Sequence, residues 1–285
     1  MGLGRALKFG GVLAGTLTEI DATQRLEQVR RNVGERMQNP LKDISFDTIA
    51  GAAEHAAIMH YRVTTDSDTR IDGGTLFLVD SGGQYVNGTT DITRTVAIGE
   101  VPEEQKRFFT LVLKGMIAIS TARFPKGSRG CDLDPLARIA LWKAGADFAH
   151  GTGHGVGSYL SVHEGPQRIS RLSTQELLPG MILSNEPGYY RPGAFGIRIE
   201  NLVVVTPQSI AGAEEEMLGF ETITFAPIAQ NLVEVALLSK ADADWLDAYH
   251  AEVLAKLGAD MEGEERAWLE AACAPLDRTP AALAA

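Results

Sequence analysis

An antiparallel α+β fold is the class that the sequence predicts. Three observations support it: β-rich runs occur in adjacent pairs, amphipathic helical segments separate and follow those pairs, and 45% of the 285 residues are hydrophobic. That content is enough to bury a sizeable core. A parallel βαβ array is disfavoured, because its strands would alternate with helices rather than stand in pairs.

The first predicted element is an amphipathic helix over residues 18–34. Thr18 and Asp21 stand three residues apart, which is the spacing of a capping box at a helix start. Apolar residues then recur at helical spacing at Ala22, Leu26, Val29 and Val33, and Gly34 ends the run.

An antiparallel strand pair is predicted next. The runs 75–80 and 91–98 are β-rich, and the region between them contains Gly and Asn-Gly sequences that can turn the chain. A helix follows Pro102, and another runs from about Asp134 to Lys143. Their apolar faces indicate packing on a common sheet.

A second pair of β-rich runs follows these helices. They are "GMILSNEPGYY" and "FGIRIENLVVV", and the turn "RPG" lies between them. We interpret the two strand pairs as the halves of a single site.

The character of the sequence changes near residue 225. Ser239 and Asp242 begin one helix, and a second helix follows Gly263. We therefore divide the chain into a larger domain, residues 1–224, and a helical C-terminal extension, residues 225–285. The aromatic residues of the extension suit a core or a subunit contact better than a ligand site, so a homodimer through the extension stays open.

Charge and composition exclude several classes of function. The net charge of −11 argues against nucleic acid or an anionic membrane as a partner, because phosphate contacts need clustered Lys and Arg. No run of about 18 apolar residues exists that could span a membrane. Residues 1–17 match a secretory signal poorly. Cys131 and Cys273 match no zinc spacing, so reduced thiols and a cytoplasmic location are expected.

Five residues are candidate metal ligands: Asp80, Asp91, His154, Glu186 and Glu200. Each has an ordinary structural explanation when it is considered alone, such as a turn carboxylate or a loop histidine. Their context favours a site, because Asp80 ends an apolar run and Glu200 lies within one. A carboxylate beside buried strands is costly unless it is paired or coordinated.

The composition of this set indicates two metal ions. Four carboxylates and one imidazole carry more negative charge than a single divalent ion needs. Oxygen ligands with one nitrogen suit Mn²⁺, Fe²⁺, Co²⁺ or Zn²⁺ and argue against a thiolate-bound structural zinc. Two such ions can share a water, lower its pKa and stabilise the charge that develops on an attacked carbonyl. The reaction class implied is hydrolysis.

Six motifs make the sequence similar to metallopeptidase family M24, which includes methionine aminopeptidase, prolidase and aminopeptidase P. They are "HYR" at 60–62, "DSGGQYVNGTTDITRT" at 80–95, "HGTGHGVG" at 150–157, "VHEGPQ" at 162–167, "SNEPGYY" at 184–190 and "GIRIEN" at 196–201. The resemblance is strongest to the aminopeptidase P members and covers roughly residues 15–275. It implies a "pita-bread" catalytic fold for residues 1–224.

The resemblance also implies an activity and a metal arrangement. The activity is that of a two-metal aminopeptidase, which hydrolyses the N-terminal Xaa-Pro bond of peptides through a metal-bound hydroxide, with Mn²⁺ as the usual metal. Asp80 would bind one ion, Asp91 and Glu200 would bridge both ions, and His154 with Glu186 would complete the second. Glu186 is also the candidate general base.

Five further residues acquire roles through the same resemblance. His60 and His163 match histidines that line the substrate site and stabilise or transfer charge during amide cleavage. His150 matches a histidine that either supports the metal ligands from behind or faces the substrate. Tyr190 matches an aromatic residue that lines the site, and Arg198 matches a support of the Glu200 carboxylate. Histidines can hold or transfer a proton near neutral pH, which suits these roles.

Two departures from the family pattern are visible. His55 stands where the family commonly has Asn, and we expect a structural role for it. The long members carry one or two domains before the catalytic one, whereas this chain starts almost at the catalytic domain. Two alternatives to the Xaa-Pro aminopeptidase therefore stay open: a catalytically silent module that binds or dimerises, and a prolidase-type Xaa-Pro dipeptidase.

Overall fold

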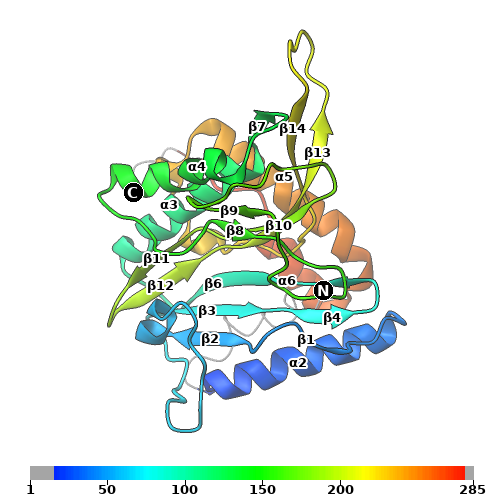
Figure 1. Cartoon of the computed structure of the whole chain (residues 1–285). Coiled ribbons are helices and arrows are strands. Elements are labelled where there is room, and N and C mark those ends of the chain that lie inside the picture. The colour runs from blue at the N-terminus through cyan, green and yellow to red at the C-terminus, as the bar shows by residue number, and fades with distance from the viewer. Residues whose placement is uncertain (1–15, 280–285) are drawn as a thin grey trace.

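The computed structural model describes residues 16–279 and has the α+β architecture that the sequence predicts (Figure 1). Every ladder in this range is antiparallel. The predicted weak signal-like stretch at residues 1–17 lies almost wholly outside the described residues. None of the helices between residues 16 and 279 combines the length and hydropathy that a membrane crossing requires.

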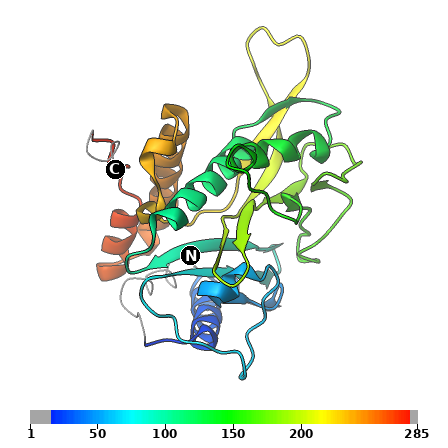
Figure 2. The ribbon, with the colours of Figure 1, turned by 90° about the vertical axis from the view of Figure 1, so that its left-hand side faces the viewer.

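Helix α2 (Glu19–Arg36) confirms the first predicted element. Thr18 and Asp21 form the capping box, and the helix continues past Gly34 by two residues. The helix lies against β2 (Ile49–Ala52), the edge strand of a sheet with the order β2-β3-β6. Figure 2 shows the helix beneath that sheet.

The strands β3 (Thr75–Ser81) and β6 (Ile92–Ile98) confirm the first predicted pair. Their antiparallel register places Asp80 opposite Thr93. The candidate ligands Asp80 and Asp91 therefore come to the same end of the sheet, as the prediction of a shared site requires.

The second predicted pair is present, but it is split into two ladders. The strands β11 (Gly188–Arg191) and β12 (Phe195–Arg198) form a hairpin. Upstream and downstream of them, β10 (Ile182–Asn185) and β13 (Asn201–Gln208) pair in a different sheet. The chain changes sheet at Glu186 and again at Glu200, so both candidate carboxylates stand at breaks between strands.

The remaining strands are short. The sheet of β10 and β13 continues through β14 (Met217–Thr222) to β7 (Arg123–Pro125), with the order β10-β13-β14-β7. Five further strands form two small sheets: β1 (Asp43–Ile44), β4 (Gly83–Tyr85), β5 (Gly88–Thr89), β8 (Gly153–His154) and β9 (Arg168–Ile169). Four 3₁₀ helices complete the described chain: η2 (Ala53–Ala57), η3 (Gln230–Leu232), η4 (Val235–Leu237) and η5 (Gly258–Asp260).

Two long helices pack against each other and lie above the β2-β3-β6 sheet in Figure 1. Helix α3 (Glu103–Ser120) begins directly after Pro102, as predicted. Helix α4 (Gly130–Lys143) begins four residues before the predicted start at Asp134. The Asp132 carboxylate accepts a hydrogen bond from the Arg129 backbone N–H, and this contact starts the helix earlier, with Pro135 inside it.

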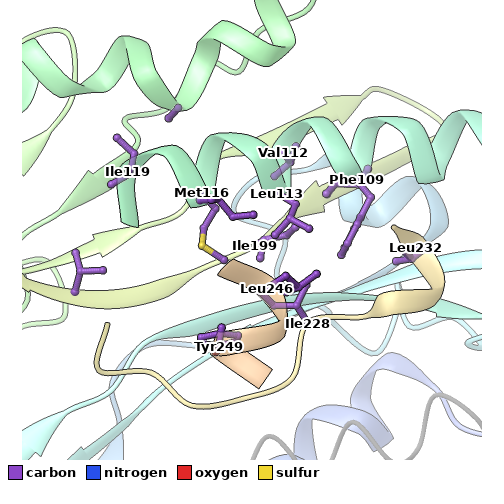
Figure 3. Packing of buried hydrophobic residues seen from close by; sticks show 14 of the residues in the cluster. Phe109, Val112, Leu113, Met116, Ile119, Ile199, Ile228, Leu232, Leu246 and Tyr249 are labelled. Atoms are coloured by element: carbon purple, nitrogen blue, oxygen red, sulfur yellow. The ribbon is translucent and has the colours of Figure 1, made fainter. Parts of the chain in front are cut away.

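Helix α5 (Lys240–Leu257) lies near α3, and helix α6 (Gly263–Ala272) packs against α5 (Figures 1 and 2). A single hydrophobic cluster joins them to the rest of the fold. Figure 3 shows Met116 of α3 facing Leu246 and Tyr249 of α5, with Ile199 in the same cluster between the two helices. The division at residue 224 stays a prediction, but residues on both sides of it share this core.

Candidate metal centre

One pocket of about 1010 Å³ collects nearly all of the predicted site residues. The nine that line it are His60, Asp80, Asp91, His150, His154, His163, Glu186, Arg198 and Glu200. They come from β3, from the loop after η2, from the residue before β6, from the segment around β8, from the end of β12 and from the breaks that flank the β11–β12 hairpin. Residues more than 100 positions apart in the chain therefore meet at one place.

Three of the candidate ligands lie close enough to hold a common ion. Asp91, His154 and Glu200 each offer one ligand atom, and these atoms lie within 4.8 Å of one another. The Nε2 atom of His154 lies 3.3 Å from an Asp91 oxygen and 3.3 Å from an oxygen of Glu186. The Nδ1 atom of His154 lies 2.9 Å from the carbonyl oxygen of Gly155. A carbonyl only accepts, so Nδ1 carries a proton and Nε2 faces the carboxylates.

Only one of the two carboxylate oxygens of Asp80 has a hydrogen-bond partner within residues 16–279. Its Oδ2 atom accepts a hydrogen bond of 2.7 Å from Nη2 of Arg198, whereas its Oδ1 atom is buried without a partner in the described chain. Arg198 also donates through Nε to the Thr93 hydroxyl, which in turn donates to Glu200 over 2.8 Å. Arg198 thus supports the Glu200 carboxylate through Thr93, while it contacts Asp80 directly.

Burial and mutual repulsion disfavour the charged forms of these carboxylates. Burial raises the pKa of Asp80 to about 6, against the opposing charge of Arg198. Burial likewise raises the pKa of Asp91, and burial with the charges of Asp91 and Asp80 raises that of Glu200. The cluster therefore carries more negative charge than its protein environment stabilises.

The surrounding carboxylates favour the charged form of His154. Burial alone would lower the pKa of His154, but the hydrogen bond to Asp91 and the charges of Glu186 and Asp91 outweigh burial and raise the pKa to about 9. A cation at this place would relieve the same excess of negative charge that retains the proton.

The residues present fit a pair of divalent cations. The buried Oδ1 atom of Asp80 has no hydrogen-bond partner within residues 16–279, although Arg198 forms an ion pair with the other oxygen of this carboxylate. Oxygen atoms with one imidazole nitrogen suit Mn²⁺ and similar ions. The two cysteines, Cys131 and Cys273, are absent from the pocket lining.

His150 belongs to a hydrogen-bonded chain beside the candidate ligands. Its Nδ1 atom lies 2.7 Å from the carbonyl oxygen of Gly151, so this nitrogen carries the proton. Its Nε2 atom accepts from the hydroxyl of Tyr190 over 2.8 Å, and that hydroxyl accepts from Nη1 of Arg198 over 2.7 Å. Burial lowers the pKa of His150 and raises that of Tyr190 to about 12, so both side chains are neutral near pH 7.

The remaining predicted residues differ in their exposure to the pocket. Tyr190 does not line it and lies behind His150 and Arg198, so the expected site-lining contact is indirect. His163 lines the pocket with its ring centroid 4.1 Å from that of His154, and burial lowers its pKa. His60 lines the pocket near Arg62.

His55 lies in a separate buried cluster. Its Nδ1 atom is 2.9 Å from the Glu19 carboxylate, which also accepts from the Tyr61 hydroxyl. These contacts tie helix α2 to the segment after β2. His55 is not among the residues that line the pocket, and its contacts agree with the expected structural role.

Sequence reasoning missed several residues that hold the site together. The Ser184 hydroxyl donates to Glu186 over 2.9 Å and accepts from the backbone N–H of His154. Thr93 stands two residues after Asp91, and Ser184 stands two before Glu186. The period of two along a strand could have found both of them.

Comparisons with known proteins agree with this geometry. The model of metallopeptidase family M24 matches residues 5–207, and that of the C-terminal region of peptidase M24 matches residues 216–276. Aminopeptidase P2 of Arabidopsis thaliana is 51% identical over 260 residues, covering 89% of this chain and 36% of that protein. A probable Xaa-Pro aminopeptidase P of Talaromyces marneffei is 46% identical over 270 residues, covering 92% of this chain and 40% of that protein.

Solved structures show the same relationship. The X-prolyl aminopeptidase of Caenorhabditis elegans, a cytosolic enzyme with a di-nuclear active site, matches with a TM-score of 0.88 and 38% identity, over 96% of this chain and 45% of that chain. The Xaa-Pro dipeptidase of Bacillus anthracis matches with a TM-score of 0.66 and 31% identity, over 80% of this chain and 57% of that chain.

These matches confirm the expected pita-bread fold, and they show how much of each relative the chain corresponds to. The chain spans 36% to 40% of the length of the two curated relatives. The family model covers most of the larger domain, and the relatives exceed 40% identity over nearly the whole chain. The chain belongs to metallopeptidase family M24.

Proposed function

We propose that this chain forms the catalytic part of an Xaa-Pro aminopeptidase, which removes the N-terminal residue from peptides with proline in the second position. The observation that carries the proposal is the convergence of Asp91, His154 and Glu200 within 4.8 Å in the pocket. The unpartnered Oδ1 atom of Asp80 supports it, because a buried carboxylate oxygen needs a hydrogen-bond donor or a cation. The aminopeptidase relatives supply the reaction class.

The proposed ligands of two divalent cations are Asp80, Asp91, His154, Glu186 and Glu200. We propose Mn²⁺ as the metal, with Co²⁺, Zn²⁺ or Fe²⁺ as substitutes that the same oxygen-rich donors accept. When bound, such ions polarise the scissile carbonyl and lower the pKa of a water. The Nδ1–H tautomer of His154, held by Gly155, leaves Nε2 available as a ligand.

The chain's own residues move the protons. Glu186 takes a proton from the attacking water, and the Ser184 hydroxyl, 2.9 Å from Oε1, fixes the orientation of that carboxylate. His163 and His60 line the pocket, where they can donate to the charge that develops on the carbonyl oxygen or to the departing amine. Arg198 favours the ionised form of Asp80 and orients Tyr190 through a hydrogen bond to its hydroxyl.

Selection for proline follows from the shape and the donors of the substrate. The proline ring is apolar, and the amide nitrogen that it contributes has no N–H. A pocket that demanded a donor at this position would reject it. Apolar side chains of Phe46, Ile49, Met59 and Val162 contribute to the pocket lining and suit an apolar ring.

Three finer properties belong to the same proposal. We propose action in the cytoplasm, by analogy with the cytosolic C. elegans enzyme. The partners are proline-containing peptides rather than nucleic acid or membranes, in agreement with the net charge of −11. A homodimer through the extension stays a prediction, which light scattering coupled to size-exclusion chromatography would test.

The first experiment measures release of the N-terminal residue from an Xaa-Pro-Xaa tripeptide. Metal-stripped protein is reloaded with Mn²⁺, and Glu186→Gln serves as the control because it removes the base while keeping the shape. Release by the parent chain and its loss in the variant support the proposal. Equal cleavage of an N-acetylated peptide would contradict it, because the free amine is expected to bind beside the metals and carboxylates.

The same experiment separates the alternatives. Refusal of tripeptides with cleavage of Xaa-Pro dipeptides would indicate a prolidase-type dipeptidase. Absence of cleavage, with no rise in melting temperature on Mn²⁺ addition, would indicate a silent module. Bound metal at 100 times its Kd stabilises a fold by about 2.7 kcal/mol, which a melting experiment detects.

A further inference from the structure

We propose that Asp134 and Arg138 of helix α4 are positioning residues for His150. They hold the backbone of residues 147–152 in the arrangement that places the His150 imidazole between Tyr190 and the pocket. The catalytic consequence of this inference rests on the proposed function, whereas its geometric part does not.

Arg138 uses all five of its N–H donors. It is 2% exposed, and its Nε and Nη2 atoms donate to the two oxygens of Asp134 over 2.7 and 3.0 Å. The other three N–H groups reach the loop after the helix. They donate to Oδ1 of Asp147 over 2.9 Å and to the carbonyl oxygens of Phe148 and His150 over 2.6 and 2.8 Å.

Asp134 extends this network to the far end of the loop. It is fully buried, and its Oδ1 atom accepts from the Thr152 hydroxyl over 2.8 Å. The carbonyl oxygen of Thr152 accepts in turn from the backbone N–H of Glu186 over 2.8 Å. The pair thus fixes the loop on both sides of His150 and connects it to a proposed metal ligand.

The aromatic ring of Phe148 completes the arrangement. The Arg138 guanidinium carbon lies 3.8 Å from the centroid of that ring, and the His150 ring lies 4.8 Å from it. Arg138 is therefore held by an aromatic face as well as by its five hydrogen bonds. A planar fork of donors can reach two carbonyls and two carboxylates together, whereas an ammonium group cannot.

Stability alone is a weak reason for this arrangement. A buried ion pair often contributes little net stability, because desolvation offsets the attraction. The geometric effect is specific: the loop backbone carries both the His150 ring and the Gly151 carbonyl that selects its Nδ1–H tautomer. That tautomer leaves Nε2 as the acceptor for Tyr190. Movement of this loop would release the ring from Tyr190.

The test uses two variants. Arg138→Lys keeps the positive charge but lacks the planar guanidinium group and its five N–H donors, and Thr152→Val removes one hydroxyl at nearly constant shape. Thr152→Ser is the conservative rescue, and Arg31→Met, which breaks an exposed helical pair with Glu27, is the control for a lost arginine elsewhere. Nitrogen-15 NMR of the six histidines in metal-free protein reports the tautomer of His150, assigned with His150→Gln.

We expect a single Nδ1–H tautomer at His150 in the parent chain, in Thr152→Ser and in Arg31→Met, and a mixture in Arg138→Lys and Thr152→Val. On the Xaa-Pro-Xaa peptide, kcat should fall about 10- to 100-fold in Arg138→Lys, with KM changed less than about threefold. The rise in melting temperature with Mn²⁺ should be retained, because the metal ligands are untouched.

An unchanged His150 tautomer in both Arg138→Lys and Thr152→Val overturns the inference. If Arg138→Lys fails to fold, the comparison of Thr152→Val with Thr152→Ser decides, because both keep the buried pair. If the parent chain releases no amino acid, the proposed function fails, and the NMR comparison in metal-free protein still decides the positioning role.

Discussion

Replacing Tyr249 by phenylalanine tests whether the C-terminal extension folds as part of the main core. The Tyr249 hydroxyl is buried, accepts from Nη2 of Arg94 over 2.9 Å and from the backbone N–H of Ala226 over 3.2 Å. It also lies 2.8 Å from the carbonyl oxygen of Ala226, to which it can donate. Arg94 belongs to strand β6, so this one hydroxyl joins helix α5 to the sheet of the candidate site.

The cost of the substitution follows from the groups that it leaves unpaired. Nη2 of Arg94 keeps two acceptors, Asn201 and the carbonyl of Ala226, but the buried N–H of Ala226 loses its partner. An orphaned buried donor costs about 1–3 kcal/mol, so we expect a loss of about 2 kcal/mol, or roughly 4 °C in Tm. Tyr189→Phe is the matched control. Its hydroxyl contacts Arg191, which keeps its pair with Glu104, so little change is expected.

The assay is urea unfolding followed by two signals. Two of the three tryptophans, Trp245 and Trp268, lie in the extension, so fluorescence reports mainly on it, whereas circular dichroism reports on the whole chain. One shared core predicts coincident transitions, shifted together in Tyr249→Phe. A fluorescence transition that precedes the other signal would refute the reasoning, because the extension would then unfold independently.

Three further predictions concern other parts of the fold. Burial and the charge of Arg94 lower the pKa of His250 to about 4, so this histidine should subtract about 3 kcal/mol from the free energy of unfolding as pH drops from 6.5 to 4. The measurement is the difference in pH dependence between the parent chain and His250→Gln, and identical dependence would contradict this contribution. A Cβ at Gly196 would lie 1.8 Å from the Ala56 carbonyl oxygen, so Gly196→Ala should lower the free energy of unfolding by at least about 2 kcal/mol, as measured by chemical unfolding. Gly88 has open space around it, so the control Gly88→Ala should lower it by less than about 1 kcal/mol. Asp80→Asn should lower bound Mn²⁺ from two ions to one per chain by elemental analysis; retention of both would contradict its proposed role.

Much of the fold could be predicted because its signals are local. The capping residues Thr18 and Ser239 mark the starts of two helices, and both starts are confirmed. The strands β3 and β6 are long, apolar and joined by a turn-rich segment, so their pairing was visible in the sequence. The predicted start of α4 at Asp134 was four residues late, because the Asp132 carboxylate caps the helix at Arg129.

The prediction of the candidate site depended on two different kinds of signal. The composition of the carboxylates and the histidine indicated metal ions, and the family motifs assigned a role to each residue. The supporting residues Asp134 and Arg138 carried no such signal, since an acidic and a basic residue four apart on a helix usually form an exposed pair. Their burial depends on the loop 147–152 folding back over the helix, which no local pattern encodes.

The breaks in the second strand pair explain why the candidate ligands converge. At Glu186 the chain leaves one sheet, and its backbone N–H donates to Thr152, next to the segment that carries His154. At Glu200 the chain returns, and its backbone N–H donates to Thr93, two residues from Asp91. Each break thus attaches a carboxylate to the strand or loop that carries its neighbour in the site. An unbroken ladder would pair those N–H groups within the hairpin, so the irregularity that the sequence pattern could not predict is what brings the site together.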